Sequence, residues 1–308
     1  MFSSYKFRIF CYVLTLQFII VINTHGQNYV DLVKLNASTT PLNTFDSSRS
    51  QSVLNEYGAD LSLPIKLNEK TAFLTGAIYE NINTKLFPDE AMQSLSGITL
   101  KLGVNHNFNE HFSTTMVLLP KLATNFGTLT QKDMQLGGIA LFKYAVNKNL
   151  NYRYGLYYNA ERFGPFFVPL LGVYYLSNNT RFELNVMLPL SADMNYRLIK
   201  FMSIGANFFG QTRSYHVSNI SPGLKSSYVV RVTNELYGYL KFTLPKNIIL
   251  LTKCGYSLGR KYRVYHDDDK TDLAFPLTYI NDHRRQLNKT FSDGLLFQAV
   301  LIYRLPLK

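Results

Sequence analysis

The stretch "ADLSLPIKLNEKTAFLTGAIY", residues 59–79, has the pattern of a β-hairpin. In its first half, apolar side chains occupy every second position, and the positions between them carry Asp60, Ser62 and Lys66. A polar turn at residues 68–70 follows, and Asn is favoured at such turns because it tolerates a positive φ. A second strand-like run then begins. Two alternating runs joined by a short polar turn predict a pair of antiparallel strands.

The same unit recurs along the chain, with runs rich in aromatic and β-branched residues on either side of each turn. Further tight connections are expected at residues 109–111, 147–149, 177–180, 199–200 and 245–247. The alternation predicts an apolar face made of Ile98, Leu100, Leu102 and Val104; of Tyr152, Tyr154, Leu156 and Tyr158; and, in the last run, of Leu295, Phe297, Ala299, Leu301, Tyr303 and Leu305. The sequence is therefore that of an all-β protein with many hairpins.

A period of two fits both a soluble β-sandwich and a membrane barrel, and three features favour the barrel. The runs have about 9–11 residues, the length of a tilted strand that crosses a bilayer. Glycines recur on the polar faces, at Gly103, Gly155, Gly205 and Gly238. Short connections alternate with long ones, of which residues 259–293 form the longest. We expect an antiparallel outer-membrane β-barrel of roughly 12–14 strands with short periplasmic turns and longer extracellular loops; the alternative is a secreted β-sandwich.

Five Leu-Pro pairs raise the question of where the strands end. The prolines of these pairs are Pro64, Pro120, Pro189, Pro245 and Pro306. Because proline has no N–H to donate to the ladder, we expect each pair at the end of a strand, where hydrogen bonding stops. Residues 186–198 form either one bent strand or two, and a strand near residues 29–36 would bring the count to 14.

The first segment reads as a cleaved signal peptide comprising residues 1–26. Lys6 and Arg8 precede an apolar run that is too short to span a membrane as a helix. Residues 27–308 are then expected to form a single barrel domain, located in the cell outer membrane of a Gram-negative bacterium. This domain keeps only Cys254, so no disulfide is expected within it.

The chain is strongly basic, with a formal net charge of +12. Solvated loops and turns explain this charge. The more specific alternative is that the basic residues contact anionic outer-membrane lipid or lipopolysaccharide phosphates. No run of five or more Lys and Arg residues occurs. Nucleic acid is not expected as a partner of an exported chain.

The segments "VPLLGVYYLSNNTRFELNVMLPLSADMNYRLIKFMSIGANFFG", "LSLPIKLNEKTAFLTGAIYE" and "FQAVLIYRLPLK" carry a family likeness. In them the chain resembles the uncharacterised outer-membrane β-barrel domains of unknown function found in Gram-negative envelopes. The resemblance covers most of the chain as a strand pattern without a catalytic signature. It implies a barrel in a membrane and a dependence on the barrel-assembly machinery. One departure is the final residue, Lys308, where many assembly signals have an aromatic; Phe297 and Tyr303 are the candidates for that role.

The densest titratable cluster is "YHDDDKTD" at residues 265–272, followed by "NDHRRQ" at residues 281–286. Consecutive aspartates point in alternate directions in an extended chain, and the spacing lacks the glycine of a calcium loop. A solvated loop explains the cluster; weak cation binding and a hydrolase using His266 and Asp268 are the alternatives. We expect no enzymatic activity, no catalytic, cofactor-binding or metal-binding residue, and no cofactor.

The expected function follows from the size of the barrel. A barrel of eight strands fills with its own side chains, whereas 12 or more strands leave room inside. We therefore expect passage or capture of a small-molecule solute through the lumen. The alternative is a structural or surface-interaction protein that acts through its extracellular loops. Within the longest loop, "AFPLTYI" at residues 274–280 is expected to be exposed, to fold back as a strand or to plug the lumen.

Overall fold

The computed structural model describes residues 29–46, 50–289 and 292–306, so the predicted signal peptide lies outside the described residues. The elements are β1 (Tyr29–Thr44), β2 (Gln51–Lys66), β3 (Thr71–Thr84), β4 (Gln93–Asn107), β5 (Phe112–Thr124), a 3₁₀ helix η1 (Gln131–Asp133), β6 (Met134–Asn147), β7 (Leu150–Glu161), β8 (Gly164–Leu176), β9 (Phe182–Leu188), β10 (Ser191–Ile199), β11 (Met202–Ser221), β12 (Leu224–Leu244), β13 (Ile248–Ser257), β14 (Lys261–His266), β15 (Leu273–Phe275), β16 (Thr278–Ile280) and β17 (Leu295–Pro306). Among the described residues, no helix is long and apolar enough to cross a membrane.

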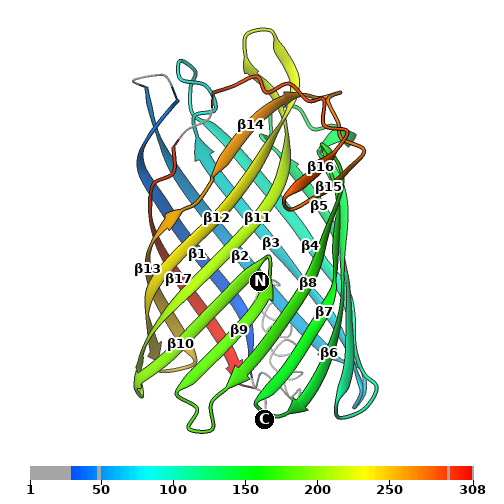
Figure 1. The fold of residues 1–308 in the computed structure, drawn as a ribbon, viewed down its shortest axis with the longest axis vertical. Helices are drawn as coiled ribbons and strands as arrows, with labels where there is room; N and C mark the ends of the chain where they lie inside the picture. Colours follow the sequence, from blue (N-terminus) through cyan, green and yellow to red (C-terminus); the bar gives the residue numbers. More distant parts are fainter. Residues whose placement is uncertain (1–28, 47–49, 290–291, 307–308) are drawn as a thin grey trace, which may run out of the picture.

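Consecutive strands pair antiparallel around a closed barrel (Figure 1). The ring closes because β17 pairs with β13 on one side and with β1 on the other. Over the described part of the chain, 14 strands make the wall: β1 to β13 together with β17. This confirms the predicted fold at the upper limit of the expected strand number. The predicted N-terminal strand is β1, and residues 186–198 belong to two strands, β9 and β10.

The predicted apolar faces point outward. Large side chains on these faces remain exposed on the barrel surface, for example those of Leu100, Tyr154 and Leu301. A surface that faces lipid has this composition. Of the four glycines expected inside, Gly103, Gly155 and Gly205 share the inward parity, and the ring of Tyr239 lies where a Cβ on Gly205 would stand. The prediction was wrong for Gly238. It lies between the exposed Leu236 and Leu240 on the outer face, with open space around it.

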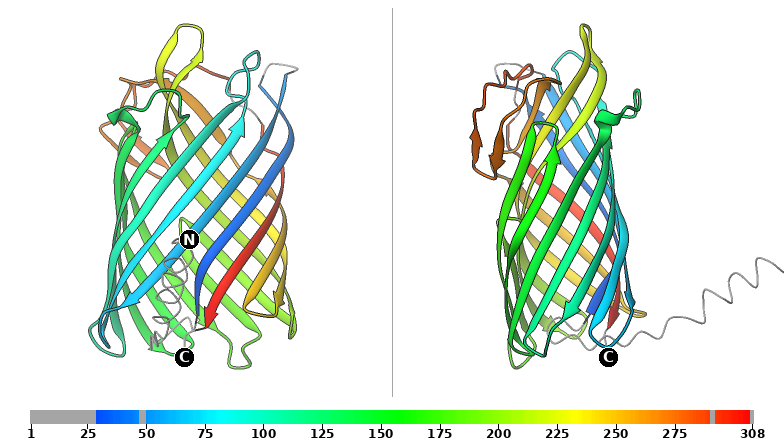
Figure 2. Two further views of the ribbon diagram at one scale, coloured as in Figure 1. Left: turned by 180° about the vertical axis from the view of Figure 1, so that it is seen from behind. Right: turned by 90° about the vertical axis from the view of Figure 1, so that its right-hand side faces the viewer.

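The tight connections gather at one end of the barrel, which we call the turn end (Figure 2). The other end, the loop end, carries the longer connections, including residues 258–294 between β13 and β17. Short connections also occur at this end, at residues 162–163 between β7 and β8 and at residues 222–223 between β11 and β12. The β9–β10 hairpin differs from these because it ends early. It turns at Pro189 and Leu190, about halfway up the wall in Figure 1. The wall therefore has a low stretch between β8 and β11.

The expectation for the Leu-Pro pairs was correct at three places and wrong at two. Pro189, Pro245 and Pro306 lie at strand ends or just beyond, but Pro64 and Pro120 lie inside β2 and β5. Proline is tolerated there because the ladder on one side is interrupted. The pairing of β1 with β2 reaches only Leu61. The pairing of β4 with β5 passes from Lys121 to Leu118 without including Pro120.

The upper half of the β11–β12 hairpin leaves the wall and crosses the barrel. The pairing of β10 with β11 stops at Phe209, and that of β12 with β13 stops at Glu235. Beyond these points His216 pairs in parallel with Thr124 of β5, a strand of the opposite wall. We call residues 210–234 the crossing hairpin; β14 extends it along its other edge.

Each face of the crossing hairpin has its own hydrophobic core. Tyr215, Val217 and Val229 pack with Leu54 and Ile82 and with other side chains, including those from β4 and β5. Tyr228 and Val230, on the other face, pack with side chains from β7, β8 and β15. A fully buried side chain of this size contributes roughly 1.5–3 kcal/mol. The two cores together fill the lumen at the loop end.

Candidate functional site

A buried ionic network anchors the crossing hairpin to the wall. Arg231 donates from Nη2 to both carboxylate oxygens of Glu56 at 2.7 Å and from Nε to the hydroxyl of Tyr262 at 3.0 Å. Arg213 forms an ion pair with Glu80, which also accepts a hydrogen bond of 2.8 Å from Tyr215. In low-dielectric surroundings such pairs hold their geometry only when they are fully hydrogen-bonded. The network fixes the hairpin against β2 and β3.

Between the crossing hairpin and the inward faces of β4 to β8 lies a cavity of about 930 Å³, which we call the chamber. This volume is at the upper end of the range for small-molecule sites. Its walls are mostly apolar, although the lumen of an outer-membrane barrel is usually polar. The inward-facing apolar side chains that line it are Val117, Leu119, Ile139, Tyr157, Phe166 and Val168.

The polar part of the chamber is cationic. Lys101, Lys121 and Arg213 line it, and the lining includes no carboxylate. Polar side chains without charge, among them Asn159 and Gln211, complete this part. The chamber thus combines apolar walls with a few convergent polar groups, the composition typical of a ligand site.

The chamber also reaches the outer surface, above the low stretch of the wall. Its lining includes Leu188, Pro189 and Leu190 from the top of the β9–β10 hairpin and Pro169 and Phe208, which share the outward parity of β8 and β11. The upper border is the β15–β16 turn, residues 275–278, which includes Leu277 with 97% of its surface exposed. β15 is held to β8 by one pair, Ala274 with Phe166. An apolar opening therefore joins the chamber to the side of the barrel.

The predicted "AFPLTYI" strand thus exists, as β15 and β16, and it borders the opening above the low stretch of the wall. The titratable cluster next to it holds the loop in place. Asp267 accepts from Arg162 at 2.6 Å and pairs with Lys132. Burial would raise the pKa of the Asp267 carboxyl, but the hydrogen bonds from Lys132 and Arg162 outweigh burial and lower that pKa.

The other charged residues of the cluster do not converge on a site. Asp282 pairs with Arg284 at 2.8 Å, and this hydrogen bond lowers the pKa of the Asp282 carboxyl. The guanidinium of Arg284 stacks over Tyr265 and Tyr279. His266 and Asp268 are exposed. In the described part of the chain, no group of three or more His, Cys, Asp or Glu residues is placed to hold a metal ion.

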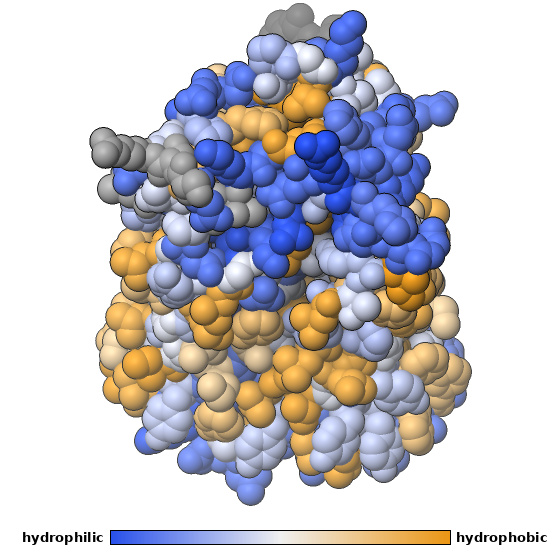
Figure 3. Space-filling model, turned by 45° about the horizontal axis from the view of Figure 1, so that its top comes forward, coloured by the Kyte–Doolittle hydropathy of each residue, from blue (hydrophilic) through white to orange (hydrophobic). Residues whose placement is uncertain are grey.

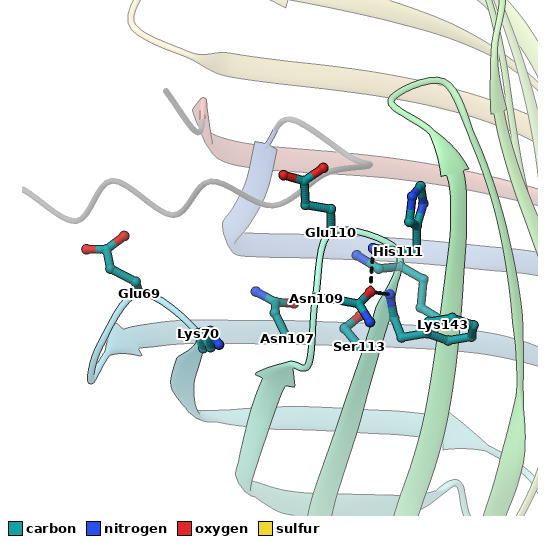
Figure 4. A pocket seen from close by; sticks show the side chains of 9 residues that line it. Glu69, Lys70, Asn107, Asn109, Glu110, His111, Ser113 and Lys143 are labelled. Carbon is teal, nitrogen blue, oxygen red and sulfur yellow. Dashed lines mark hydrogen bonds between the residues drawn. The ribbon is translucent and has the colours of Figure 1, made fainter.

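A second hollow, of about 210 Å³, lies at the turn end (Figure 4). Asn109 Oδ1 accepts from the backbone N–H groups of His111 and Phe112, at 2.9 Å each, which fixes the tight turn. His111 Nδ1 lies 2.7 Å from the carbonyl oxygen of Ala145. The exposed Glu69 lies apart from these groups in Figure 4. The hollow is a gap between neighbouring turns, formed by residues that shape those turns.

The sequence contains one signal for the chamber, the continuous apolar run in β5. In "TTMVLLP" of β5, apolar residues occupy both parities, with Met116 and Leu118 outward and Val117 and Leu119 inward. A strand that faces lipid on one side and water on the other should alternate. Continuous apolar runs therefore mark the strands with an apolar inner face.

Several solved structures are similar to the chain. A TodX monoaromatic hydrocarbon channel deltaS2 mutant has 11% sequence identity to the chain, with 89% of each chain covered and a TM-score of 0.40. The translocator domain of the autotransporter NalP from Neisseria meningitidis has 10% identity over 90% of this chain and 89% of that one, with a TM-score of 0.37. The NanC porin has 8% identity over 89% of this chain and 100% of that one, with a TM-score of 0.34.

No curated protein matches the sequence. One family does match, over residues 30–293, from the first residues of β1 to the end of the connection between β13 and β17. This range contains the crossing hairpin and every side chain of the chamber. The chain therefore belongs to DUF6268, a family described as a domain of unknown function.

Proposed function

We propose that the chain is exported through a cleaved signal peptide of residues 1–26 and inserted into the outer membrane of a Gram-negative bacterium, with the turn end toward the periplasm. The surface supports this placement: hydrophobic residues surround the strands, and hydrophilic residues cover the loop end (Figure 3). Strands insert as hairpins, so short turns stay on the side of assembly.

Within that membrane, we propose that the barrel captures a small, largely apolar molecule in the chamber and exchanges it through the opening above the β9–β10 hairpin. The observation that carries this function is the chamber itself, a cavity of about 930 Å³ with apolar walls that reaches the side of the barrel. The filled loop end argues against an open aqueous pore. Capture of a solute agrees with both the volume and the lining.

Fluorescence quenching tests this function, because the chain contains no tryptophan. We expect Tyr157→Trp, which places an indole at the chamber wall, to be quenched saturably by the neutral probe bromobenzyl alcohol in lipid nanodiscs. The reason is that a finite site fills, whereas partition into lipid does not saturate.

The control is Tyr154→Trp on the outer face of the same strand, where Tyr154 is exposed. Quenching there should rise linearly with the probe. If both variants give the same linear curve, the chamber does not capture the probe and the proposed function is wrong.

A further inference from the structure

Lys121 stands out among the chamber residues, because its ammonium group is buried without a hydrogen bond. Its side chain is 4% exposed, and Nζ has no hydrogen-bond partner among the described residues. It shares the inward face of β5 with Val117 and Leu119, so the charge lies beside the apolar wall. A buried charge with unused donors is costly, and cores usually satisfy such groups.

The nearest carboxylate, Glu161, is already engaged by other donors. Its Oε1 lies 3.5 Å from Lys121 Nζ and accepts from Asn159 at 2.5 Å. Its Oε2 accepts from the backbone N–H of Ser214 at 2.7 Å and from the hydroxyl of Ser214 at 2.5 Å. Glu161 therefore balances the charge of Lys121 through a long contact of 3.5 Å and leaves donor capacity on Nζ.

The other two cations of the chamber form closer ion pairs than Lys121 does. Lys101 pairs with Asp60 and donates to Ser62 at 2.8 Å. Arg213 pairs with Glu80. Neither of these carboxylates lines the chamber. A molecule inside the chamber thus meets cationic groups and no carboxylate. Arg213 Nη1 also has no hydrogen-bond partner among the described residues, but it is held in a close ion pair with Glu80, whereas the carboxylate nearest to Lys121 Nζ is 3.5 Å away.

We propose that the ligand of the chamber is an amphipathic carboxylate, whose apolar or aromatic body packs against Val117, Leu119 and Tyr157 and whose carboxylate accepts hydrogen bonds from Lys121. This inference rests on the proposed function and names its substrate class. A charge-assisted hydrogen bond from an ammonium to a carboxylate is stronger than one between neutral groups. The ligand would supply the partner that Lys121 lacks.

Calorimetric titration of the barrel in nanodiscs tests the proposal with two probes that share one apolar body, phenylbutyrate and phenylbutanol. We expect the carboxylate to bind about tenfold more tightly than the alcohol, the effect of one hydrogen bond to a charged group. Lys121→Gln should remove this preference by weakening the binding of phenylbutyrate much more than that of phenylbutanol. Lys121→Arg, which keeps the charge, should retain most of it.

Lys253→Gln is the matched control. Lys253 faces the lumen outside the chamber and donates to Asn207, so its removal should leave the preference intact. Equal binding of both probes by the unmodified protein would overturn the carboxylate assignment while the proposed function stands. If folded Lys121→Gln protein keeps the preference for the carboxylate, the role of Lys121 is likewise overturned while the proposed function stands. Binding of neither probe would refute the capture function itself.

Discussion

Replacing Arg231 with methionine should lower the free energy of unfolding by about 3–5 kcal/mol, the usual effect of breaking a buried ion pair on one side. Arg231 lies inside the barrel with 4% of its side chain exposed, and it holds both carboxylate oxygens of Glu56 at 2.7 Å. Its loss leaves the half-buried Glu56 without its ion-pair partner and detaches the crossing hairpin from β2. Urea unfolding in detergent micelles, followed by circular dichroism, measures the change.

Two variants control this result. Arg231→Met combined with Glu56→Gln removes both charges of this pair and should recover a large part of the lost stability, because position 56 no longer carries an unpaired charge. Lys66→Met breaks a surface pair with Glu69, whose side chain is 84% exposed, and should cost less than about 1 kcal/mol. If Arg231→Met costs no more than Lys66→Met, the network does not anchor the hairpin.

Filling the chamber should have the second large effect. Leu119→Trp places an indole in the cavity from its β5 wall, and we expect the affinity for phenylbutanol to fall about tenfold. Displacing some 50–60 Å² of apolar contact costs about 1.4 kcal/mol at the usual coefficient, which is a factor of ten. Calorimetric titration in nanodiscs gives the affinity.

Leu118→Trp is the matched control for that variant. Leu118 precedes Leu119 on the same strand, but its side chain faces outward and is exposed. The same substitution there should leave binding unchanged, because tryptophan is tolerated on a lipid-facing surface. Equal affinities in both variants would show that the probe binds outside the chamber.

The closed barrel was predictable from the sequence because its signal is local. Alternation within each run and polar residues such as Asn68 and Asn109 at the turns specify hairpins, and sequential hairpins with one apolar face close into a barrel. A strand near residues 29–36 was also anticipated. The sequence left open whether residues 186–198 form one bent strand or two, and the structure has two, β9 and β10.

The crossing hairpin was not predicted, because it depends on a contact between distant segments. The pairing of His216 with Thr124 joins β11 to a strand of the opposite wall. No local pattern in β11 predicts that β5 is its partner. A trace of it is nevertheless present in "SYVVRV" at residues 227–232. Tyr228 and Val230 are buried on one face and Val229 on the other. Apolar residues at consecutive positions are typical of a strand covered on both faces.

The apolar run of β5 marks an apolar inner face, but the cavity itself was not predictable, for the same reason. Its volume exists only because β9 and β10 end early while β11 and β12 continue across the lumen. Lys121 reads in the sequence as one more polar residue of an inward face. Its missing hydrogen bonds become visible only when Glu161 and Ser214 are placed around it.

Disulfide cross-linking tests whether the crossing hairpin reaches the opposite wall of the barrel. In a background with Cys254→Ser, the pair His216→Cys and Thr124→Cys should form a disulfide in the folded protein, because paired strand residues lie within the roughly 4.4–6.8 Å between Cα atoms that a disulfide requires. The pair Ser96→Cys and Thr124→Cys joins neighbouring wall strands and should link in any barrel with this register. Efficient linking of both pairs is the predicted result. Linking of the wall pair alone, with position 216 left unlinked, would show that the hairpin does not cross the lumen and that the chamber does not exist.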